Sequence, residues 1–488
     1  MKKNTHANLP PDSHVLFFTA TAVCVRRLYG VDDLRVEPHP TQVEKPLGPN
    51  DVRVRVGAVG ICGSDVHYLK HMRCADFVVE KPMVIGHEAA GVVAEVGSAV
   101  RELACGDHVA LEPGVPCRTC GHCKTGRYNL CEGMEFHATP PVHGSLARFV
   151  THPSDFCFKL PPGMTLEEGA MCEPVSVGVH ACRRAGVEPG QKVAVLGAGP
   201  IGLVSMMVAK AFGAAAVVIT DVSDERLKVA KDLGADVVVN VKGLSPADAA
   251  AGVVGEGGRR PDACVDCCGF ESSVATALAA AKSGGKVCLV GMGHNMMNLP
   301  VTGSAAREVD LVGVFRYRDA YPTAIHLVGS GAIDVQPLIT HRFSLAEDFS
   351  SEAINEGFRV SAGGGDAIKV MFDLIKGADK PPSSEGMDGG ERDIKWDFHI
   401  EHLPIFAECV LRRYSSIYAC GSWTRGHVYL YAANRIYHRM LRSHLRGGGG
   451  RPKICATSTS PCFLPVGVLA SVIVCGQQLG STRLWENT

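Results

Sequence analysis

Alternation of apolar and polar residues dominates the first third of the chain. Residues 51–60 (DVRVRVGAVG) alternate and then turn on glycines, and further Val-rich segments with interspersed glycines follow over residues 84–113. Alternation of this kind is typical of strands with one buried face. The pattern therefore predicts a mainly β region over residues 25–175.

Short apolar runs alternate with helical segments in the middle of the chain. Six buried strands are predicted, at residues 192–196, 217–220, 237–239, 263–266, 287–290 and 311–314. Predicted helices at 203–212 and 225–233 each stop before a glycine. Six strands that alternate with helices predict a doubly wound parallel sheet.

The pattern changes again toward the C-terminus. Residues 320–374 predict one or two helices and a strand-like segment, AIKVMF, which is expected to return to the first domain. Beyond residue 374 the periodic pattern stops, and residues 377–393 are rich in Gly, Pro, Asp and Ser. All three tryptophans of the chain also lie beyond residue 374. We therefore expect residues 375–488 to form an atypical, disordered tail, and residues 1–27 to form an atypical N-terminal segment.

Composition excludes some classes of function. With 46% hydrophobic and 20% charged residues the chain is typical of a globular protein, and its net charge of −1 gives no overall attraction to nucleic acid or an anionic membrane. The longest apolar run, 462–475, is too short to span a membrane and contains Pro465 and Gly467. Twenty cysteines without a clear secretory signal favour metal ligation and buried thiols over disulfides. We expect neither a nucleic acid nor a membrane as a partner.

The sequence GAGPIG at 197–202 follows a predicted strand and opens a predicted helix. There its first glycine permits a tight turn, its second lets the backbone approach a pyrophosphate, and its third allows close packing of helix on strand. Asp221 follows 19 residues after Gly202, where a carboxylate accepts ribose hydroxyls and repels a 2′-phosphate, so NAD is expected rather than NADP. Arg226 could meet such a phosphate but is interpreted as a first-turn helix residue. The predicted cofactor-binding residues are Gly197, Gly199, Pro200, Ile201, Gly202, Asp221 and Arg226.

Four cysteines lie within fifteen residues of a glycine-containing loop, at Cys117, Cys120, Cys123 and Cys131. Thiolates suit tetrahedral zinc, and a closed four-cysteine site is of the structural kind. A set of redox thiols is the alternative. The spacing favours a structural zinc.

A second set of metal-ligand residues is spread over three segments: Cys62 in GICGSDVHY, His87 and Glu88 in IGHEAAG, and Glu173 in MCEP. Mixed ligands suit a catalytic zinc with an open position. Asp65 could accept the second ring N–H of His87. Ser64 and His67 could carry a proton from the site to solvent, while Tyr68 could be a pocket wall or a core ring.

Taken together, GHEAAGVVAEVG, the four-cysteine loop and GAGPIG resemble the zinc-dependent medium-chain dehydrogenases. Longer strings, among them ICGSDVHYLK, EEGAMCEPVSVGVHACRR and GVFRYRDAYPTAI, are similar to the sorbitol dehydrogenase group of that family, nearest to its plant type. The resemblance covers residues 28–374. Ala89 and Glu135 depart from it, because the family more often has Cys and Phe at these positions.

The resemblance implies a GroES-like catalytic domain of 28–180 completed by 320–374, and a Rossmann NAD-binding domain of 181–319. It implies a catalytic zinc on Cys62, His87 and Glu88, with Glu173 binding the ion directly or through a water, and a second zinc on the four cysteines. It also implies a homotetramer in the cytoplasm. The substrate contacts that it implies are Ser64, Tyr68, Phe136, Thr139, Glu173, Arg316 and Tyr317.

The expected reaction is NAD-dependent oxidation of a polyol, such as sorbitol, xylitol or ribitol, at C2 to the ketose, with Ser64, His67 and Glu173 as catalytic residues. Arg316 favours a polyol because its planar fork donates several hydrogen bonds. Another zinc dehydrogenase, acting on xylitol, L-arabinitol or threonine, stays open as an alternative. So does an inactive NAD-binding relative, although such a protein need not retain the metal-ligand residues.

Overall fold

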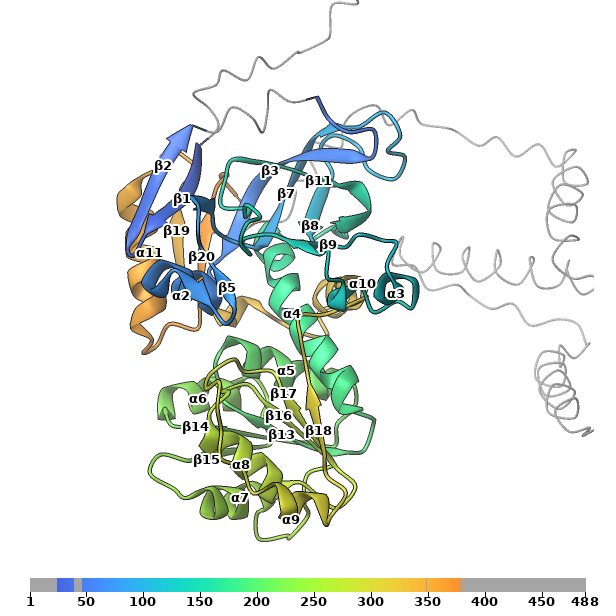
Figure 1. Ribbon diagram of the computed structural model, residues 1–488, viewed down its shortest axis with the longest axis vertical. Coiled ribbons are helices and arrows are strands. Elements are labelled where there is room, and N and C mark those ends of the chain that lie inside the picture. The colour runs from blue at the N-terminus through green and yellow to red at the C-terminus, as the bar shows by residue number, and fades with distance from the viewer. Residues whose placement is uncertain (1–23, 39–45, 348, 378–379, 381–488) are drawn as a thin grey trace, which may run out of the picture. The chain divides into compact units, whose positions relative to one another are not determined.

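The computed structural model describes residues 24–38, 46–347, 349–377 and 380. The described residues form a mainly β part and a parallel α/β part (Figure 1). Nearly all of the expected C-terminal tail lies outside the described residues. Of the expected atypical N-terminal segment, only residues 24–27 are described, and they begin a strand.

The mainly β part is built on a seven-stranded sheet in the order β12-β8-β7-β3-β20-β19, with β11 also paired to β3. A smaller sheet, β2-β1-β6, carries the first strands of the chain. The strands of the two sheets are β1 (Cys24–Gly30), β2 (Asp33–Pro38), β3 (Asp51–Gly60), β6 (Met83–Val84), β7 (Glu88–Val96), β8 (His108–Leu111), β11 (Phe149–Pro153), β12 (Cys157–Lys159), β19 (Ile339–Ser344) and β20 (Lys369–Asp373).

Strand β3 brings segments that are distant in sequence to one place. It pairs antiparallel with β7, so that Gly60 lies opposite Glu88, and with β20, so that Gly60 also lies opposite Met371. In Figure 1 the orange β20 accordingly lies beside the blue β3. The chain turns into a helix just after Gly60, and the end of β3 is therefore where a site can draw side chains from three segments.

Short elements connect these strands. They are α2 (Gly63–His71), β4 (Arg73–Cys74), β5 (Phe77–Val78), β9 (Gly114–Val115), α3 (Gly121–Lys124), the 3₁₀ helices η2 (Tyr128–Leu130) and η3 (Ser154–Phe156), and β10 (Glu135–Phe136). Helix α3 and η2 belong to the four-cysteine segment.

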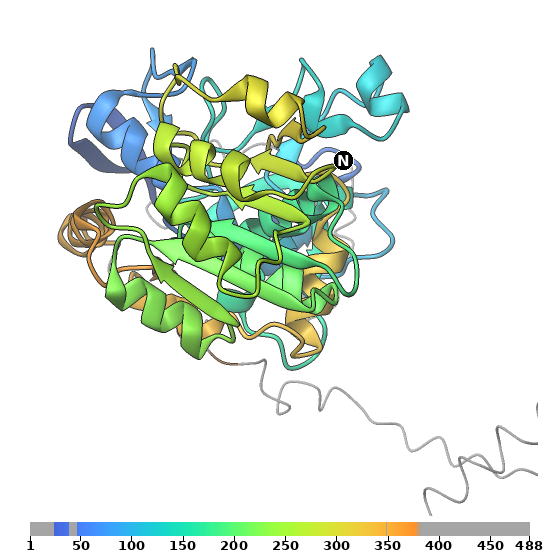
Figure 2. The ribbon, with the colours of Figure 1, turned by 90° about the horizontal axis from the view of Figure 1, so that it is seen from below.

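The α/β part is a six-stranded parallel sheet in the order β15-β14-β13-β16-β17-β18, the arrangement of a doubly wound fold. Figure 2 shows helices on both faces of this sheet. Its elements are β13 (Lys192–Leu196), α5 (Pro200–Ala211), β14 (Ala216–Asp221), α6 (Asp224–Asp232), β15 (Val237–Asn240), α7 (Pro246–Val254), β16 (Ala263–Asp266), α8 (Glu271–Ala280), β17 (Lys286–Leu289), α9 (Val301–Ala305) and β18 (Asp310–Gly313).

Strand β13 has an apolar centre, which suits a strand that is buried on both faces. Val193 and Val195 pack in one core cluster with α5, whereas Ala194 and Leu196 pack in another with α7 and α8. Successive residues of a strand point to opposite faces, so a sheet covered on both sides needs an uninterrupted apolar run. The run VAVL at residues 193–196 meets that need.

Helix α4 (Leu166–Ala185) packs on both the β sheet and the parallel α/β part. Thr165 caps its start, and the Glu168 side chain accepts from the Thr165 N–H in return. Helices α10 (Tyr321–Gly329) and α11 (Ser351–Gly363), together with η4 (Gln336–Leu338), lead the chain back to the first sheet. Among the described residues, no helix is both long and apolar enough to cross a membrane.

Candidate active site and metal centres

Cys62, His87 and Glu88 converge at the end of β3. Their potential ligand atoms all lie within 4.8 Å of one another, with His87 and Glu88 buried and Cys62 partly so. Cys62 stands just before α2, and His87 and Glu88 stand at the start of β7. One thiol, one imidazole and one carboxylate around a common point fit a zinc ion, and three protein ligands leave a fourth position open.

Asp65 holds the first two of these residues in place. Its carboxylate accepts N–H groups of Cys62 and Gly86, at 3.0 and 3.1 Å, and lies 3.6 Å from Nδ1 of His87. Burial alone would raise the pKa of Asp65, but His87 and the two backbone donors lower it below its usual value. Since Asp65 faces Nδ1, the Nε2 atom of His87 stays available for a metal.

Glu88 also has a partner that sequence reasoning missed. The Lys369 Nζ donates to both Glu88 oxygens, at 2.7 and 2.6 Å, and to the Ile61 carbonyl, and both side chains are almost fully buried. Gly60 makes this possible, because a Cβ there would lie 2.2 Å from Oε2 of Glu88. A lysine inside the apolar run AIKVMF was the available signal, since a lysine buried in a strand needs an anionic partner.

Glu173 lies near the three residues but is not one of the cluster whose ligand atoms meet. Its Oε1 accepts from the Tyr317 hydroxyl at 2.9 Å, and both side chains are buried. Burial raises the pKa of Glu173 to about 7, with the charge of Glu88 adding to the effect.

Arg316 lies among aromatic rings. Its guanidinium carbon stands 4.0 Å from the centre of the Phe136 ring, 4.8 Å from Phe315 and 5.7 Å from Phe77, and its Nη2 donates to Thr139 Oγ1 at 3.2 Å. The Phe136 ring also lies 5.8 Å from that of His87, and Tyr68 shares a hydrogen bond with Thr139. The structure therefore brings the predicted substrate residues Tyr68, Phe136, Thr139, Arg316 and Tyr317 together around the metal-ligand residues.

The predicted proton relay is less defined. Ser64 is half-buried in the first turn of α2, whereas His67 is exposed on the same helix, with its ring 5.8 Å from that of His71. Their place between site and surface is compatible with a path for protons. Their role stays a prediction.

The four cysteines meet in a second cluster. The Sγ atoms of Cys117, Cys120, Cys123 and Cys131 lie within 4.8 Å of one another, with 3.5 Å between Cys120 and Cys123 and 3.9 Å between Cys117 and Cys123. Tetrahedral zinc with bonds of about 2.3 Å places its sulfurs about 3.8 Å apart, so the geometry fits. Hydrogen bonds from Thr119 and Cys120 lower the pKa of the Cys117 thiol to about 6, whereas desolvation and the neighbouring cysteines raise the pKa of Cys123 to about 12. A metal would have to displace the proton of Cys123.

The glycine turn is shaped for a phosphate group. A Cβ on Gly202 would lie 1.8 Å from the Gly197 carbonyl oxygen, so a side chain there is impossible, whereas nothing stands within 4 Å of a Cβ on Gly199. Gly197 has φ +98°, and Pro200 begins α5. The space beside Gly199 at the N-terminus of α5 fits a pyrophosphate.

Asp221 ends the second strand of the parallel sheet beside this turn. Its carboxylate accepts N–H groups of Ala198 at 2.7 Å and of Val222 and Ser223 at 2.8 and 3.0 Å. Arg226 is half-buried in the first turn of α6, where Ser223 caps its N–H. This placement fits ribose recognition by Asp221, as expected for NAD.

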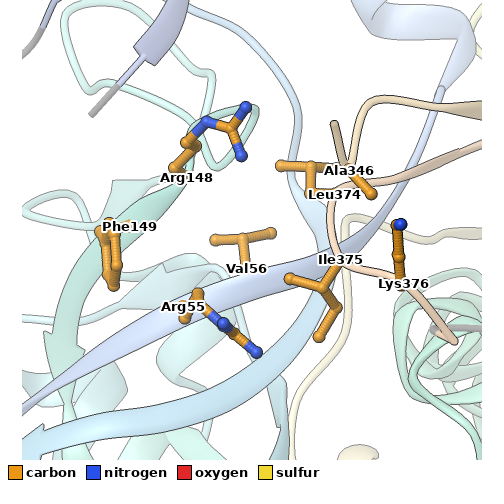
Figure 3. Close-up of a pocket in the computed structure, with 8 residues that line it drawn as sticks. All are labelled: Arg55, Val56, Arg148, Phe149, Ala346, Leu374, Ile375 and Lys376. Atoms are coloured by element: carbon orange, nitrogen blue, oxygen red, sulfur yellow. The ribbon is translucent and has the colours of Figure 1, made fainter. Parts of the chain in front are cut away.

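A cavity of about 410 Å³ lies elsewhere, between β3, β11 and the residues after β20 (Figure 3). None of the predicted site residues lines it, and its lining offers arginine, lysine and apolar side chains but no metal-ligand group. The lining residues are Arg55, Val56, Arg148, Phe149, Ala346, Leu374, Ile375 and Lys376. It is not the active site.

Comparisons with known proteins agree with this geometry. The family model described as "Alcohol dehydrogenase GroES-like domain" matches residues 48–162, and that described as "Zinc-binding dehydrogenase" matches residues 200–330. They cover the mainly β part and the parallel α/β part respectively. The expected fold class is thereby confirmed.

Curated relatives are similar along most of their length. A sorbitol dehydrogenase of Arabidopsis thaliana is 57% identical over 349 residues, which cover 71% of this chain and 94% of the relative, and an L-idonate 5-dehydrogenase of Vitis vinifera is 53% identical with 71% and 93% coverage. The solved L-idonate 5-dehydrogenase of Escherichia coli has a TM-score of 0.64 at 29% identity, covering 72% of this chain and 98% of that one. The chain thus belongs to the zinc-dependent medium-chain dehydrogenases and is an oxidoreductase of the sorbitol dehydrogenase type.

Proposed function

We propose that the chain oxidises sorbitol, and with it xylitol or ribitol, at C2 to the ketose. The observation that carries this proposal is the position of Arg316 and Thr139 beside the cluster of Cys62, His87 and Glu88. A wall with a guanidinium and hydroxyls suits a chain of hydroxyl groups, whereas a simple alcohol needs only an apolar wall.

In this proposal Cys62, His87 and Glu88 hold the catalytic zinc, and the glycine turn and Asp221 hold NAD. When bound, the zinc polarises the substrate hydroxyl and lowers its pKa, and NAD accepts the hydride. Asp65 orients His87, while Lys369 fixes the carboxylate of Glu88. The protein's contribution is to align the C2 hydroxyl with these groups.

The hydroxyl proton needs an acceptor close to neutral pH. Glu173 is suited to receive it because burial raises its pKa to about 7, and Tyr317 orients its carboxylate. Ser64 and His67 form the alternative path, from the metal-ligand residues to the exposed face of α2.

A second candidate substrate follows from the grapevine relative, which is named for L-idonate. L-Idonate carries a similar row of hydroxyls and a carboxylate, and Arg316 offers a charge that could pair with it. The polyol remains our proposal because the uncharged hydroxyl groups of Tyr68 and Thr139 lie on the same wall.

For assembly and location, we propose a homotetramer in the cytoplasm, which rests on the resemblance to plant members of the family. A measurement of the mass in solution tests the tetramer. Fractionation of the source cells tests the location.

The reaction is tested by NADH formation with sorbitol, xylitol, ribitol, L-idonate and ethanol. We expect Cys62→Ala to reduce turnover about a thousandfold, because losing one ligand removes several kcal/mol of transition-state stabilisation. The exposed Cys105, outside both clusters, gives the control Cys105→Ala, which should keep full turnover. Zinc analysis should find one ion fewer in Cys62→Ala, and unchanged turnover in that variant would refute the assignment of the site.

A further inference from the structure

Residues 315–319, here called the substrate loop, carry both Arg316 and Tyr317. Two residues of this loop have left-handed backbone angles, Arg316 with φ +49° and Asp319 with φ +48°. Residues other than glycine rarely adopt this conformation unless surrounding contacts impose it. The loop therefore needs support from outside to present Arg316.

The support comes largely from the four-cysteine segment, 117–131, here called the cysteine lobe. The buried Asn129 donates from Nδ2 to the Phe315 carbonyl at 3.0 Å. Arg318 donates to the Gly126 carbonyl at 2.6 Å, and the Asp319 N–H donates to the Tyr128 hydroxyl at 2.6 Å. Three hydrogen bonds thus connect the lobe to both sides of Arg316.

The three lobe partners lie between two of the four cysteines. Gly126, Tyr128 and Asn129 stand in the short stretch from Cys123 to Cys131, which includes η2. An ion bound to the four thiolates would fix both ends of this stretch. The position of the lobe metal is thereby connected to the position of the substrate loop.

A second set of contacts holds the ends of the loop independently. From the last turn of α4, Arg184 donates to the Gly313 carbonyl, and Arg183 donates to the Asp319 carbonyl and to Thr323. These bonds keep the path of the chain if the lobe contacts are lost. Loss of the lobe contacts should then affect the middle of the loop and not the fold.

We propose that the cysteine lobe is a positioning device for the substrate, which sets Arg316 through Asn129 and Arg318. Asn129 and Arg318 are positioning residues in this scheme, because they act on the loop backbone. The idea rests on the proposed function for the identity of the substrate. It adds a role for the second metal centre in substrate binding.

The test compares the full chain with variants of the lobe and of the loop. Asn129→Asp keeps the shape of the side chain but replaces its N–H donor with an oxygen facing the Phe315 carbonyl, and Arg318→Ala removes the bond to Gly126. We expect each of these two variants to raise KM for sorbitol about tenfold, because one well-placed hydrogen bond is lost. Their kcat and their KM for NAD should stay within about twofold of the values of the unchanged chain. Arg127→Ala and Thr125→Ala are matched controls, because both residues are exposed in the same lobe and no side-chain bond joins either to the loop.

Two readouts do not depend on catalysis. Zinc analysis should still find two ions in Asn129→Asp, while hydrogen–deuterium exchange should become faster in peptides that cover residues 313–321. Cys117→Ser should lose the lobe ion and give the same faster exchange and the same rise in KM. Adding Asn129→Asp to Cys117→Ser should cause little further change, because both act through one connection.

Unchanged KM and unchanged exchange in Asn129→Asp would overturn the proposal, as would equal effects in Arg127→Ala. A fall in kcat together with a rise in KM for NAD, at unchanged KM for sorbitol, would also overturn it, because that result indicates general damage. If the unchanged chain oxidises no polyol, the proposed function fails, and the exchange of residues 313–321 still shows whether the lobe holds the loop.

Discussion

At the scale of single residues, His152 connects burial to pH. It lies on β11 with only 2% of its surface exposed, its Nε2–H donates to the Glu112 carbonyl at 2.8 Å, and its ring lies 4.7 Å from that of His137. Burial lowers the pKa of His152 from 6.5 to about 4. Between these values the unfolded chain binds a proton that the folded protein does not bind.

Stability should consequently fall as the pH falls from 6.5 toward 4. At about 1.4 kcal/mol per pKa unit, this residue contributes a loss of at most about 3.5 kcal/mol. His152→Gln keeps a donor for the Glu112 carbonyl but cannot bind a proton. We expect its midpoint of chemical unfolding to change less between pH 7.5 and 5.5 than that of the unchanged chain.

The exposed His326 on α10 supplies a control for this comparison, since His326→Gln should leave the pH dependence as it was. Equal pH dependence in His152→Gln and in the unchanged chain would show that other groups cause the loss. Metal release at low pH affects all three proteins alike and drops out of the comparison.

Residues that belong to a motif could be predicted from the sequence, whereas the partners that support them from distant segments, such as Lys369 and Asn129, could not. The glycine turn and the four cysteines each act within one short segment, so their spacing indicates their chemistry. Lys369 meets Glu88 across 281 positions, and Asn129 meets the Phe315 carbonyl across 186. No periodicity encodes such pairs, because they depend on how the strands are ordered.

At the scale of elements, the parallel sheet was predicted closely. The expected strand at 192–196 is β13, and the helix expected at 203–212 begins three residues earlier, at Pro200, because proline suits the first turn. The strand at 51–60 coincides with β3. The pairing of β3 with β20 is antiparallel and distant in sequence, so an alternating pattern could not reveal it.

Strand β19 is joined to α4 by an ion pair that should be important for stability. Arg342 donates to both oxygens of the fully buried Glu167, at 2.7 and 2.9 Å. Removing one partner of a buried ion pair lowers the free energy of unfolding by about 3–5 kcal/mol. We expect a loss at the lower end of this range, because the Arg342 side chain is 38% exposed. Arg342→Leu should therefore lower the free energy of unfolding by about 3 kcal/mol, measured by chemical denaturation.

Arg359→Leu serves as the comparison for that measurement. Arg359 pairs with Glu356 within α11, but its side chain is 73% exposed, and surface pairs of this kind contribute at most about 1 kcal/mol. Similar losses in the two variants would mean that the burial of Glu167 does not determine the cost.

At the scale of the whole molecule, the described residues 24–380 contain both metal clusters, the glycine turn and the substrate loop. The Arabidopsis relative matches 94% of its own length with only 71% of this chain. Among the described residues the first strand, β1, begins at Cys24, slightly before residue 28, where the catalytic domain is expected to begin.

A chain shortened to residues 24–380 should therefore bind two zinc ions and oxidise sorbitol with kcat and KM within about twofold of the full chain.

A chain of residues 46–380 should fail to fold into an active form, because it lacks β1 and β2. Without them Met83 and Val84 lose their partner strand, and the core loses Leu28 and Leu34, which are 0% and 7% exposed. Two such buried leucines contribute at least about 4 kcal/mol, a large fraction of a domain's stability. Thermal unfolding and sorbitol-dependent NADH formation, measured on both shortened chains, distinguish the two cases. Activity in the full chain but not in residues 24–380 would mean that the omitted residues contribute to the active form.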